Sequence, residues 1–306
     1  MKNRRAGKFE SGCKGCADCD CKKDESPKEL YPMYTSKILK VIEENYKVKT
    51  FEIDHELIRT YPGQFIMVWV PGVGERPMSI GNNMPLTISV AKVGDVSGKI
   101  HELKKGDVIS YRGPFGKGFT PPQPKKQNPE HETQNPLAAI EGKRILVIGG
   151  GYGVVTMFFL AKRAKEMGME TIAVIGGRSV QDIIYEKHLF GVCKAVFVTT
   201  DDGSKGRKGN VMSEAEALIE SKNFDMVYCC GPERMMEAVA NLCRMHKIPC
   251  QVSIERYMKC GVGVCGSCAI DGKLTCIDGP VFSGEVALAM KEFGKPHRDA
   301  SGKSKE

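Results

Sequence analysis

The segment ILVIGGGYGVVTMFFLAKRAKEM, residues 145–167, decides the fold of the C-terminal half of the chain. Ile145–Ile148 is a short apolar run, a glycine-rich turn follows, and Val154–Met167 has the apolar spacing of a helix. This order predicts a buried strand, a tight turn and a helix. Glycines in such a turn let the phosphates of a dinucleotide approach the backbone, and the positive end of the helix favours their charge. We therefore expect nucleotide binding at Gly149–Gly153; the alternative is a strand–helix corner that uses glycine only to turn.

Strands and helices continue to alternate after this segment. The expected elements are a strand at Thr171–Ile175, a helix at Val180–Phe190, a strand at Ala195–Val198, a helix at Met212–Ser221, a strand at Met226–Cys229 and a helix at Arg234–His246. Such alternation is typical of a parallel, doubly wound sheet. We expect this α/β nucleotide-binding domain to span residues 143–250.

The preceding residues, 32–119, have the pattern of an antiparallel β-barrel. Short β-rich segments are separated by turn residues such as Pro62-Gly63, Gly81-Asn82-Asn83 and Gly106-Asp107, and Ile100–Lys105 has the pattern of one short helix. Several strands at this spacing favour a barrel. The expected strands are Ile38–Tyr46, Val48–Ile53, Gln64–Val70, Leu86–Val93 and Val108–Arg112. Residues 120–142, with prolines among polar residues, are expected to link the two domains.

Four cysteines follow the α/β domain in the order C-x4-C-x2-C-x7-C: Cys260, Cys265, Cys268 and Cys276. This is the plant-type [2Fe–2S] spacing, in which four thiolates hold two irons. Gly261, Gly263 and Gly266 allow the loop to curl around a cluster. A zinc knuckle is the alternative, but only Cys265 and Cys268 form a close C-x2-C element. We expect a small [2Fe–2S] module at residues 251–290 and a basic tail at 291–306.

A second group of cysteines lies in the N-terminal extension, residues 1–31. Cys13, Cys16, Cys19 and Cys21 form a C-x2-C-x2-C-x-C run in a segment that is poor in large apolar side chains. The first three match the opening of the bacterial ferredoxin spacing, and the fourth follows too soon. The run is compatible with a second metal or iron–sulfur cluster, or with a thiol-rich tail that binds nothing.

Composition excludes several classes of function. The chain has 306 residues and 13 cysteines, and its polar, lysine-rich start lacks the apolar segment of a signal peptide, so we expect a cytoplasmic protein that binds metal. The net charge of +8 is not arranged as a basic stripe with aromatics, which argues against nucleic acid. The longest uncharged stretch, Ile145–Ala161, is short and interrupted by glycines, which argues against a membrane span. The six scattered histidines provide no catalytic triad, as expected for a protein whose cofactors do the chemistry.

The order of these motifs resembles that of the ferredoxin–NADP reductase superfamily. Within it the chain is most similar to the electron transfer subunits of dihydroorotate dehydrogenase, over about residues 33–298. Sulfhydrogenase gamma subunits and the small subunit of NADH-dependent ferredoxin:NADP oxidoreductase share much of the pattern, and the ending FGKPHRDASG favours the dihydroorotate branch. The motifs that carry the resemblance are R-P-x-S at 76–79, G-P-x-G-x-G-F at 113–119, G-G-G-x-G at 149–153, T-D-D-G-S at 200–204, C-G-P at 230–232, the cysteine loop from Glu255, and D-G-P-V-F at 278–282.

The resemblance implies which residues bind cofactors. Arg76 resembles the arginine that contacts the FAD diphosphate, and Ser79 the hydroxyl that faces the reactive edge of the flavin. Met78 stands where the superfamily commonly has an aromatic residue that stacks on the flavin. The remaining cofactor-binding residues that the motifs imply are Pro77 and Ser97 for the flavin, and Gly150, Gly151, Gly153, Asp202, Gly203, Cys230, Gly231 and Pro232 for the nicotinamide nucleotide.

The resemblance also implies a function. It implies an electron transfer subunit that passes electrons between NAD and an FMN-containing catalytic subunit through FAD and the [2Fe–2S] cluster, within a heterotetramer of pyrimidine biosynthesis. The alternatives are a subunit of a hydrogenase or ferredoxin-linked complex, and a redox- or metal-sensing module that reports NADH. NAD is expected over NADP, although Arg178 follows the second strand of the nucleotide domain, where an arginine can read a 2′-phosphate.

Overall fold

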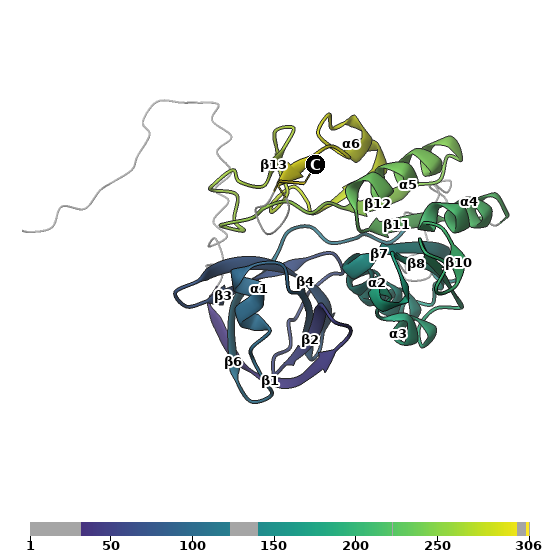
Figure 1. Cartoon of the computed structure of the whole chain (residues 1–306). Helices are drawn as coiled ribbons and strands as arrows, with labels where there is room; N and C mark the ends of the chain where they lie inside the picture. Colours follow the sequence, from purple (N-terminus) through teal and green to yellow (C-terminus); the bar gives the residue numbers. More distant parts are fainter. Residues whose placement is uncertain (1–31, 123–139, 222, 299–303, 306) are drawn as a thin grey trace, which may run out of the picture. The chain divides into compact units, whose positions relative to one another are not determined.

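The first part of the chain forms a closed antiparallel barrel, as predicted (Figure 1). The computed structural model describes residues 32–122, 140–221, 223–298 and 304–305, so the cysteine run at 13–21 lies outside the described residues. The barrel core is made of inward-facing apolar side chains, among them Ile66, Ile80 and Tyr111. Around the barrel the strands are β1 (Tyr34–Glu43), β2 (Val48–Ile53), β5 (Leu86–Ala91), β4 (Gly74–Asn83), β3 (Phe65–Val70) and β6 (Val108–Phe115).

Two local predictions in the barrel were wrong. The segment Gly81-Asn82-Asn83 belongs to β4 and is no turn, because Asn82 and Asn83 pair with Thr87 and Leu86 of β5. Residue 81 is a glycine at a close approach to helix α2 (Val154–Glu166), where a Cβ would lie 2.8 Å from Val155 Cγ1. The short helix is α1 (Asp95–Ile100) and ends where the predicted one begins. At the third position of the helix, the Ser97 hydroxyl accepts hydrogen bonds from the Val93 and Gly94 N–H groups, which fixes where the helix starts.

The second part is a seven-stranded sheet with helices on both faces, which confirms the predicted α/β fold (Figure 1). Helices α2 and α3 cover one face, and α4 and α5 cover the other. The strand order is β10 (Arg207–Lys208), β9 (Ala195–Thr200), β8 (Glu170–Gly177), β7 (Arg144–Gly150), β11 (Met226–Cys230), β12 (Cys250–Ser253) and β15 (Val281–Ser283). The covering elements are η2 (Gly151–Gly153), α2 (Val154–Glu166), η3 (Val180–Asp182), α3 (Glu186–Phe190), α4 (Val211–Ser221) and α5 (Glu233–Met245).

The helix predicted at Val180–Phe190 is two short pieces, η3 and α3. Tyr185 separates them with a left-handed φ of 61°, which a helix interior does not allow. Its hydroxyl makes hydrogen bonds of 3.0 Å with Ser89 Oγ and 3.4 Å with Thr50 Oγ1, both on barrel strands. The break therefore lets Tyr185 join the nucleotide domain to the barrel.

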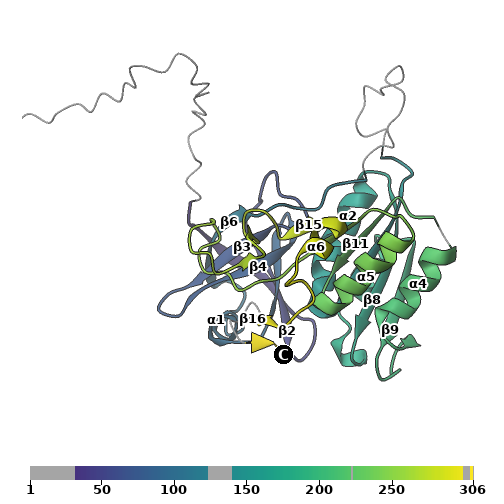
Figure 2. The same ribbon diagram turned by 90° about the horizontal axis from the view of Figure 1, so that it is seen from above.

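The cysteine loop leaves and re-enters the sheet. It runs from β12 to β15, which pair antiparallel, so both ends of the loop are anchored in the sheet. In both views this segment extends over the barrel (Figure 1, Figure 2). The remaining elements are β13 (Ala269–Ile270), β14 (Lys273–Leu274), α6 (Gly284–Ala289), β16 (His297–Arg298) and β17 (Ser304–Lys305).

Within the described ranges, no helix is both long enough and apolar enough to cross a bilayer. The uncharged stretch Ile145–Ala161 is divided among β7, η2 and the first half of α2.

Candidate functional site

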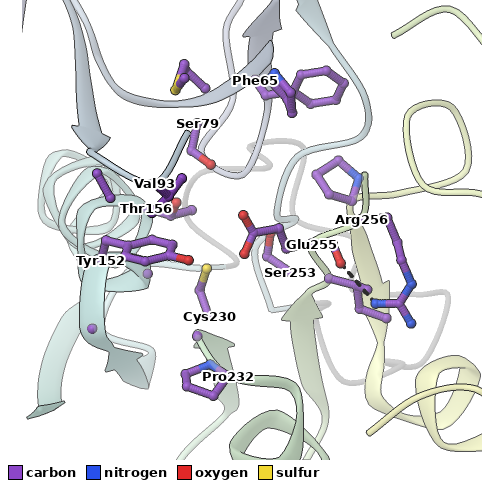
Figure 3. Close-up of a pocket in the computed structure, with 18 of the residues that line it drawn as sticks. Phe65, Ser79, Val93, Tyr152, Thr156, Cys230, Pro232, Ser253, Glu255 and Arg256 are labelled. Carbon is purple, nitrogen blue, oxygen red and sulfur yellow. Dashed lines mark hydrogen bonds between the residues drawn. The ribbon is translucent and has the colours of Figure 1, made fainter. Parts of the chain in front are cut away.

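A cavity of about 940 Å³ opens between the barrel, the sheet and the cysteine loop. This volume falls in the range of ~300–1,000 Å³ that is typical of small-molecule and cofactor sites. Figure 3 shows that its labelled side chains come from all three parts of the chain. Of the cofactor-binding residues that the motifs imply, the cavity is lined by Arg76, Pro77, Met78, Ser79, Ser97, Gly150, Gly151, Gly153, Cys230, Gly231 and Pro232.

The barrel side of the cavity combines a cation with hydroxyls. Arg76 donates through Nη1 to the Glu75 carbonyl oxygen at 2.8 Å, and its guanidinium carbon lies 5.1 Å from the centre of the Tyr257 ring. These contacts hold the arginine at the cavity wall, where a diphosphate can accept its other N–H groups. Ser79 is exposed to the cavity, whereas the Ser97 hydroxyl is already used in capping α1.

The sheet side presents the glycine-rich turn. At Gly153 a Cβ would lie 2.5 Å from the Cys230 carbonyl oxygen, so only glycine lets this turn pack against the end of β11. Gly151 has a φ of +55° and no heavy atom within 4 Å of its ideal Cβ position. The turn therefore brings bare backbone to the cavity at the start of α2, as required for the approach of a dinucleotide phosphate.

Cys230 and Glu255 face the same space as Ser79 (Figure 3). Burial, together with the negative charge of Glu255, raises the pKa of the Cys230 thiol to about 12, and hydrogen bonds with Thr156 and Ser253 offset only part of this shift. The thiol is therefore neutral near pH 7.

Sequence reasoning did not identify Glu255 as a site residue. Its carboxylate points into the cavity (Figure 3), two residues after the end of β12. The signal was available, because ligands of open α/β sheets bind at the carboxyl ends of the strands. It was missed because β12 was not predicted.

The four thiols of the cysteine loop stand as two pairs. Cys265 makes a hydrogen bond with Cys260, and Cys276 makes one with Cys268. Hydrogen bonding, first with Ser267 and then with Cys260, lowers the pKa of the exposed Cys265 to about 6. Burial raises the pKa of Cys276 to about 12. In the described part of the chain, no three His, Cys, Asp or Glu side chains are arranged to hold a single metal ion.

Backbone geometry and ion pairs fix this loop on the barrel. Gly261 has a φ of +73°, and a Cβ there would lie 2.9 Å from Met67 Cγ on β3. Arg112 of β6 pairs with both carboxylate oxygens of Glu75, at 2.8 and 2.7 Å, and donates to the Cys260 carbonyl oxygen at 2.9 Å. The loop is thus tied to the barrel directly beside its first cysteine.

One apolar cluster separates the cavity from the cysteines. Phe65, Met67 and Phe115 of the barrel pack with Met258, Cys268 and Cys276 of the loop. Phe65 and Met258 also line the cavity. A group in the cavity and a group held by the buried cysteines would therefore share one wall.

A buried ion pair joins the nucleotide domain, the loop and the C-terminal segment. Arg256 pairs with Glu233 at the start of α5, and their side chains are 5% and 7% exposed. Glu233 Oε2 also accepts from the Gly294 N–H at 3.1 Å. Arg256 follows Glu255, so this pair positions the residues on that side of the cavity.

A second cavity of about 500 Å³ lies at the carboxyl ends of β7, β8 and β9. Gly150, Gly151 and Pro232 line both cavities, so the two adjoin at the glycine-rich turn. Asp202 and Gly203 line neither, and Asp201 lines the second. Asp202 is turned aside because its Oδ1 accepts hydrogen bonds from the Ser204 N–H and hydroxyl.

Two family models match the chain. Residues 255–286 match the iron–sulfur cluster binding domain of dihydroorotate dehydrogenase B, and residues 147–241 match the oxidoreductase NAD-binding domain. The chain therefore carries an iron–sulfur binding domain and a nucleotide-binding domain. The first match covers the cysteine loop and Glu255, and the second covers the glycine-rich turn and the end of β11.

Similar proteins cover nearly the whole chain. A probable dihydroorotate dehydrogenase B (NAD(+)) electron transfer subunit of Methanocaldococcus jannaschii is 38% identical over 87% of this chain and 96% of its own length. A protein of the same description from Pyrococcus furiosus is 39% identical over 86% of this chain and 97% of its own. A solved structure of NADH-dependent reduced ferredoxin–NADP oxidoreductase superposes with a TM-score of 0.69, at 28% identity over 82% of this chain and 88% of that one.

Proposed function

The chain belongs to the family of dihydroorotate dehydrogenase B electron transfer subunits, and we propose that it passes electrons between a nicotinamide nucleotide and a catalytic partner that oxidises dihydroorotate. It is an oxidoreductase subunit whose own residues bind and position cofactors. In this proposal the partner contains FMN and two copies of each subunit assemble.

The observation that carries the proposal is the shared wall between the large cavity and the cysteines. Phe65 and Met258 line the cavity and pack with Cys268 and Cys276. A flavin in the cavity and an iron–sulfur cluster on the loop would therefore be neighbours inside the protein. Electrons that enter at the nicotinamide side would leave through the loop.

We assign the large cavity to FAD, which when bound exchanges an electron pair with nicotinamide and single electrons with an iron–sulfur cluster. Arg76 would hold its diphosphate and Ser79 would face its reactive edge. Met78 offers a polarisable side chain where the superfamily commonly has an aromatic ring. Glu255 and the neutral Cys230 thiol bound the opposite side, where the nicotinamide would enter.

We assign the loop to a [2Fe–2S] cluster. Its four cysteines are the donor set that such a cluster needs, and Cys260 interacts with Cys265 as Cys268 does with Cys276. The positive φ of Gly261 and the bond from Arg112 to the Cys260 carbonyl fix the first ligand on the barrel.

The partner would dock at the outer side of this loop. Val264 is 83% exposed and Ile277 46% exposed, and Cys265 is exposed beside Val264. Exposed apolar side chains next to a redox centre are suited to a protein interface. Docking there would bring the partner's flavin close to the cluster.

A second candidate keeps the cofactors and changes the partner. The likeness to the ferredoxin–NADP oxidoreductase structure is consistent with this reading, in which the chain serves a ferredoxin-linked complex. The two candidates differ in which partner subunit stays bound to the chain during purification.

Affinity purification of the tagged chain from its own cells under anaerobic conditions tests the choice. We expect a dihydroorotate dehydrogenase catalytic chain with FMN at equal stoichiometry. A large iron–sulfur or nickel subunit in its place would support the second candidate. A Val264→Asp variant should lose the partner and keep its cofactors, whereas Val180→Asp, at an exposed residue of the nucleotide domain, should keep both.

A further inference from the structure

The end of the second cavity carries an arginine that is already paired with a carboxylate. Strands β8 and β9 run in register there, with Gly177 opposite Thr200, so Arg178 and Asp201 follow at neighbouring positions. Both residues line the cavity. This is where a dinucleotide-binding sheet meets the adenosine ribose of its ligand.

Arg178 is held by two partners. Its Nε and Nη2 donate to the two carboxylate oxygens of Asp182 at 3.1 and 3.3 Å, and Nη2 also donates to the Tyr46 hydroxyl at 3.1 Å. The Tyr46 hydroxyl in turn donates to Asp182 at 2.9 Å. Partial burial acts to raise the pKa of Asp182, but the bonds from Arg178 and Tyr46 outweigh it and lower the pKa, so the carboxylate is ionised at neutral pH.

The barrel supplies part of this arrangement. Tyr46 lies in the hairpin between β1 and β2, and its neighbour Asn45 donates to the Gln181 carbonyl oxygen at 2.9 Å. Asn45 and Lys47 of the same hairpin line the cavity. The flavin domain thus contributes to the adenosine end of the nucleotide domain's cavity.

We propose that Asp182 and Tyr46 determine nucleotide selectivity by occupying the Arg178 guanidinium, so that the site accepts a ribose 2′-hydroxyl and rejects a 2′-phosphate. The inference rests on the proposed function, since it concerns the nucleotide that the second cavity would bind. Asp201 would accept hydrogen bonds from the ribose hydroxyls and would repel a phosphate dianion. Lys47 is the cation of the hairpin that could oppose this selectivity, and the test therefore includes it.

Calorimetric titration of the purified full chain with ADP-ribose and with 2′-phospho-ADP-ribose tests the unmodified protein. We expect ADP-ribose to bind at least about tenfold more tightly, because the second ligand adds a dianion beside two carboxylates. Equal or tighter binding of the 2′-phosphorylated ligand would overturn the inference and leave the proposed function standing. If neither ligand binds, both the inference and the nucleotide site of the proposed function fall.

Asp182→Asn is the decisive variant. It keeps the shape of the side chain and removes the charge, so 2′-phospho-ADP-ribose should bind about tenfold more tightly than to the unmodified chain. Adding Arg178→Ala should abolish this gain, and adding Lys47→Ala should not. Glu166→Gln, which releases Arg163 from a similar exposed pair away from the cavity, should leave the ratio unchanged.

Two outcomes would contradict the proposed role. If Asp182→Asn does not change the ratio of the two affinities, the Asp182 carboxylate does not control whether Arg178 can bind the 2′-phosphate. If the gain survives Arg178→Ala and disappears with Lys47→Ala, the lysine reads the phosphate and the inference is wrong.

A melting curve for each variant shows whether it is folded. Tyr46→Phe provides a second, milder variant, because it removes one hydrogen bond to Asp182 and one from Arg178. The expected direction of its effect is the same.

Discussion

Two serines at the wall of the large cavity show how a hydroxyl's partners decide its role. Ser97 accepts from the Val93 and Gly94 N–H groups at 3.0 Å and donates to the Gly94 carbonyl at 2.9 Å, whereas Ser79 is exposed to the cavity. The motif resemblance implied a flavin contact for both. The hydrogen bonds favour Ser79 for that contact and make Ser97 a helix cap.

Alanine substitutions separate the two serines. Ser97→Ala should lower the free energy of unfolding by about 1 kcal/mol, because the backbone groups at the start of α1 lose their hydrogen bonds to the hydroxyl. Ser79→Ala should leave the melting temperature unchanged and slow the reduction of a dye by NADH. Thermal melts and steady-state rates on both variants check this. A stability loss for Ser79→Ala with no change in rate would contradict the assignment.

The exposed ligand of the cysteine loop gives a second residue-scale prediction. Cys265→Ser replaces a thiolate by a weak ligand, so the chain should lose iron–sulfur absorption and electron transfer to its partner. NADH-dependent reduction of a two-electron dye should persist, because the large cavity is untouched. Cys193→Ser, at a cysteine outside both cavities and the loop, should keep the iron–sulfur content. Full iron and sulfide content in Cys265→Ser would contradict the proposed ligand set.

Among single residues, the sequence predicts those that stand in a known motif. It does not predict those whose orientation depends on the hydrogen bonds of a turn. The spacing predicts the four cysteines as a ligand set, and Arg76 and Ser79 of the R-P-x-S motif line one cavity. The choice between Asp201 and Asp202 was not predictable, because it depends on which carboxylate the Ser204 N–H and hydroxyl capture.

Among the elements, α5 and the cysteine loop depend on each other through the buried Arg256–Glu233 pair. Glu233→Gln would leave a buried guanidinium without its counter-charge and should cost about 3–5 kcal/mol of unfolding free energy. Glu233→Gln with Arg256→Met removes both charges and should recover most of that loss. Chemical denaturation of the two variants checks this.

A surface pair provides the comparison for that prediction. Glu102→Gln breaks the exposed Lys99–Glu102 pair and should cost less than about 1 kcal/mol. If Glu233→Gln is no more costly than Glu102→Gln, the buried pair does not stabilise the connection between α5 and the loop.

The boundaries of helices and strands were predictable where a hydrophobic period runs through a long segment. They were not predictable where contacts with distant segments set the end of an element. The strands and helices around the glycine-rich turn lie within a few residues of their predicted positions. The helix at 180–190 is broken because the Tyr185 hydroxyl binds the barrel, and Gly81 lies in a strand because the residues around it pair with β5. Contacts between distant segments leave no local pattern in the sequence.

For the whole molecule, buried thiols and phenols predict how stability changes with pH. Burial raises the pKa of Cys193 from 9.0 and of Tyr111 from 10.0, each to about 12. Groups whose pKa is higher in the folded state contribute stability below their unfolded pKa, and this stability is lost as pH rises through the folded value. The melting temperature should therefore be flat from about pH 7 to 8.5 and fall between about pH 9 and 12.

Cys193→Ala removes one of these groups and should make the alkaline fall shallower. The melts are run anaerobically with a reductant so that thiols do not oxidise. A melting temperature that rises above pH 9, or a slope unchanged in Cys193→Ala, would contradict the burial argument.

The order of the modules was predictable, and their packing was not. Composition and hydrophobic periodicity distinguished a barrel, an α/β domain and a cysteine loop, in that order along the chain. Nothing in the sequence indicated that β12 and β15 anchor the loop in the sheet, or that Phe65 and Met258 lie between the cavity and the cysteines. Phe65 and Met258 are about 190 positions apart in the chain, and their packing joins the barrel and the cysteine loop in the proposed path for electrons.

Anaerobic titration of the purified chain with NADH, followed by its visible spectrum, tests that path most directly. We predict flavin and iron–sulfur absorption in the untreated sample, with both sets of bands bleaching as NADH is added. A chain that lacks iron–sulfur absorption, or whose iron–sulfur bands persist after the flavin is fully reduced, would contradict the proposal that electrons leave the nucleotide through the cysteine loop.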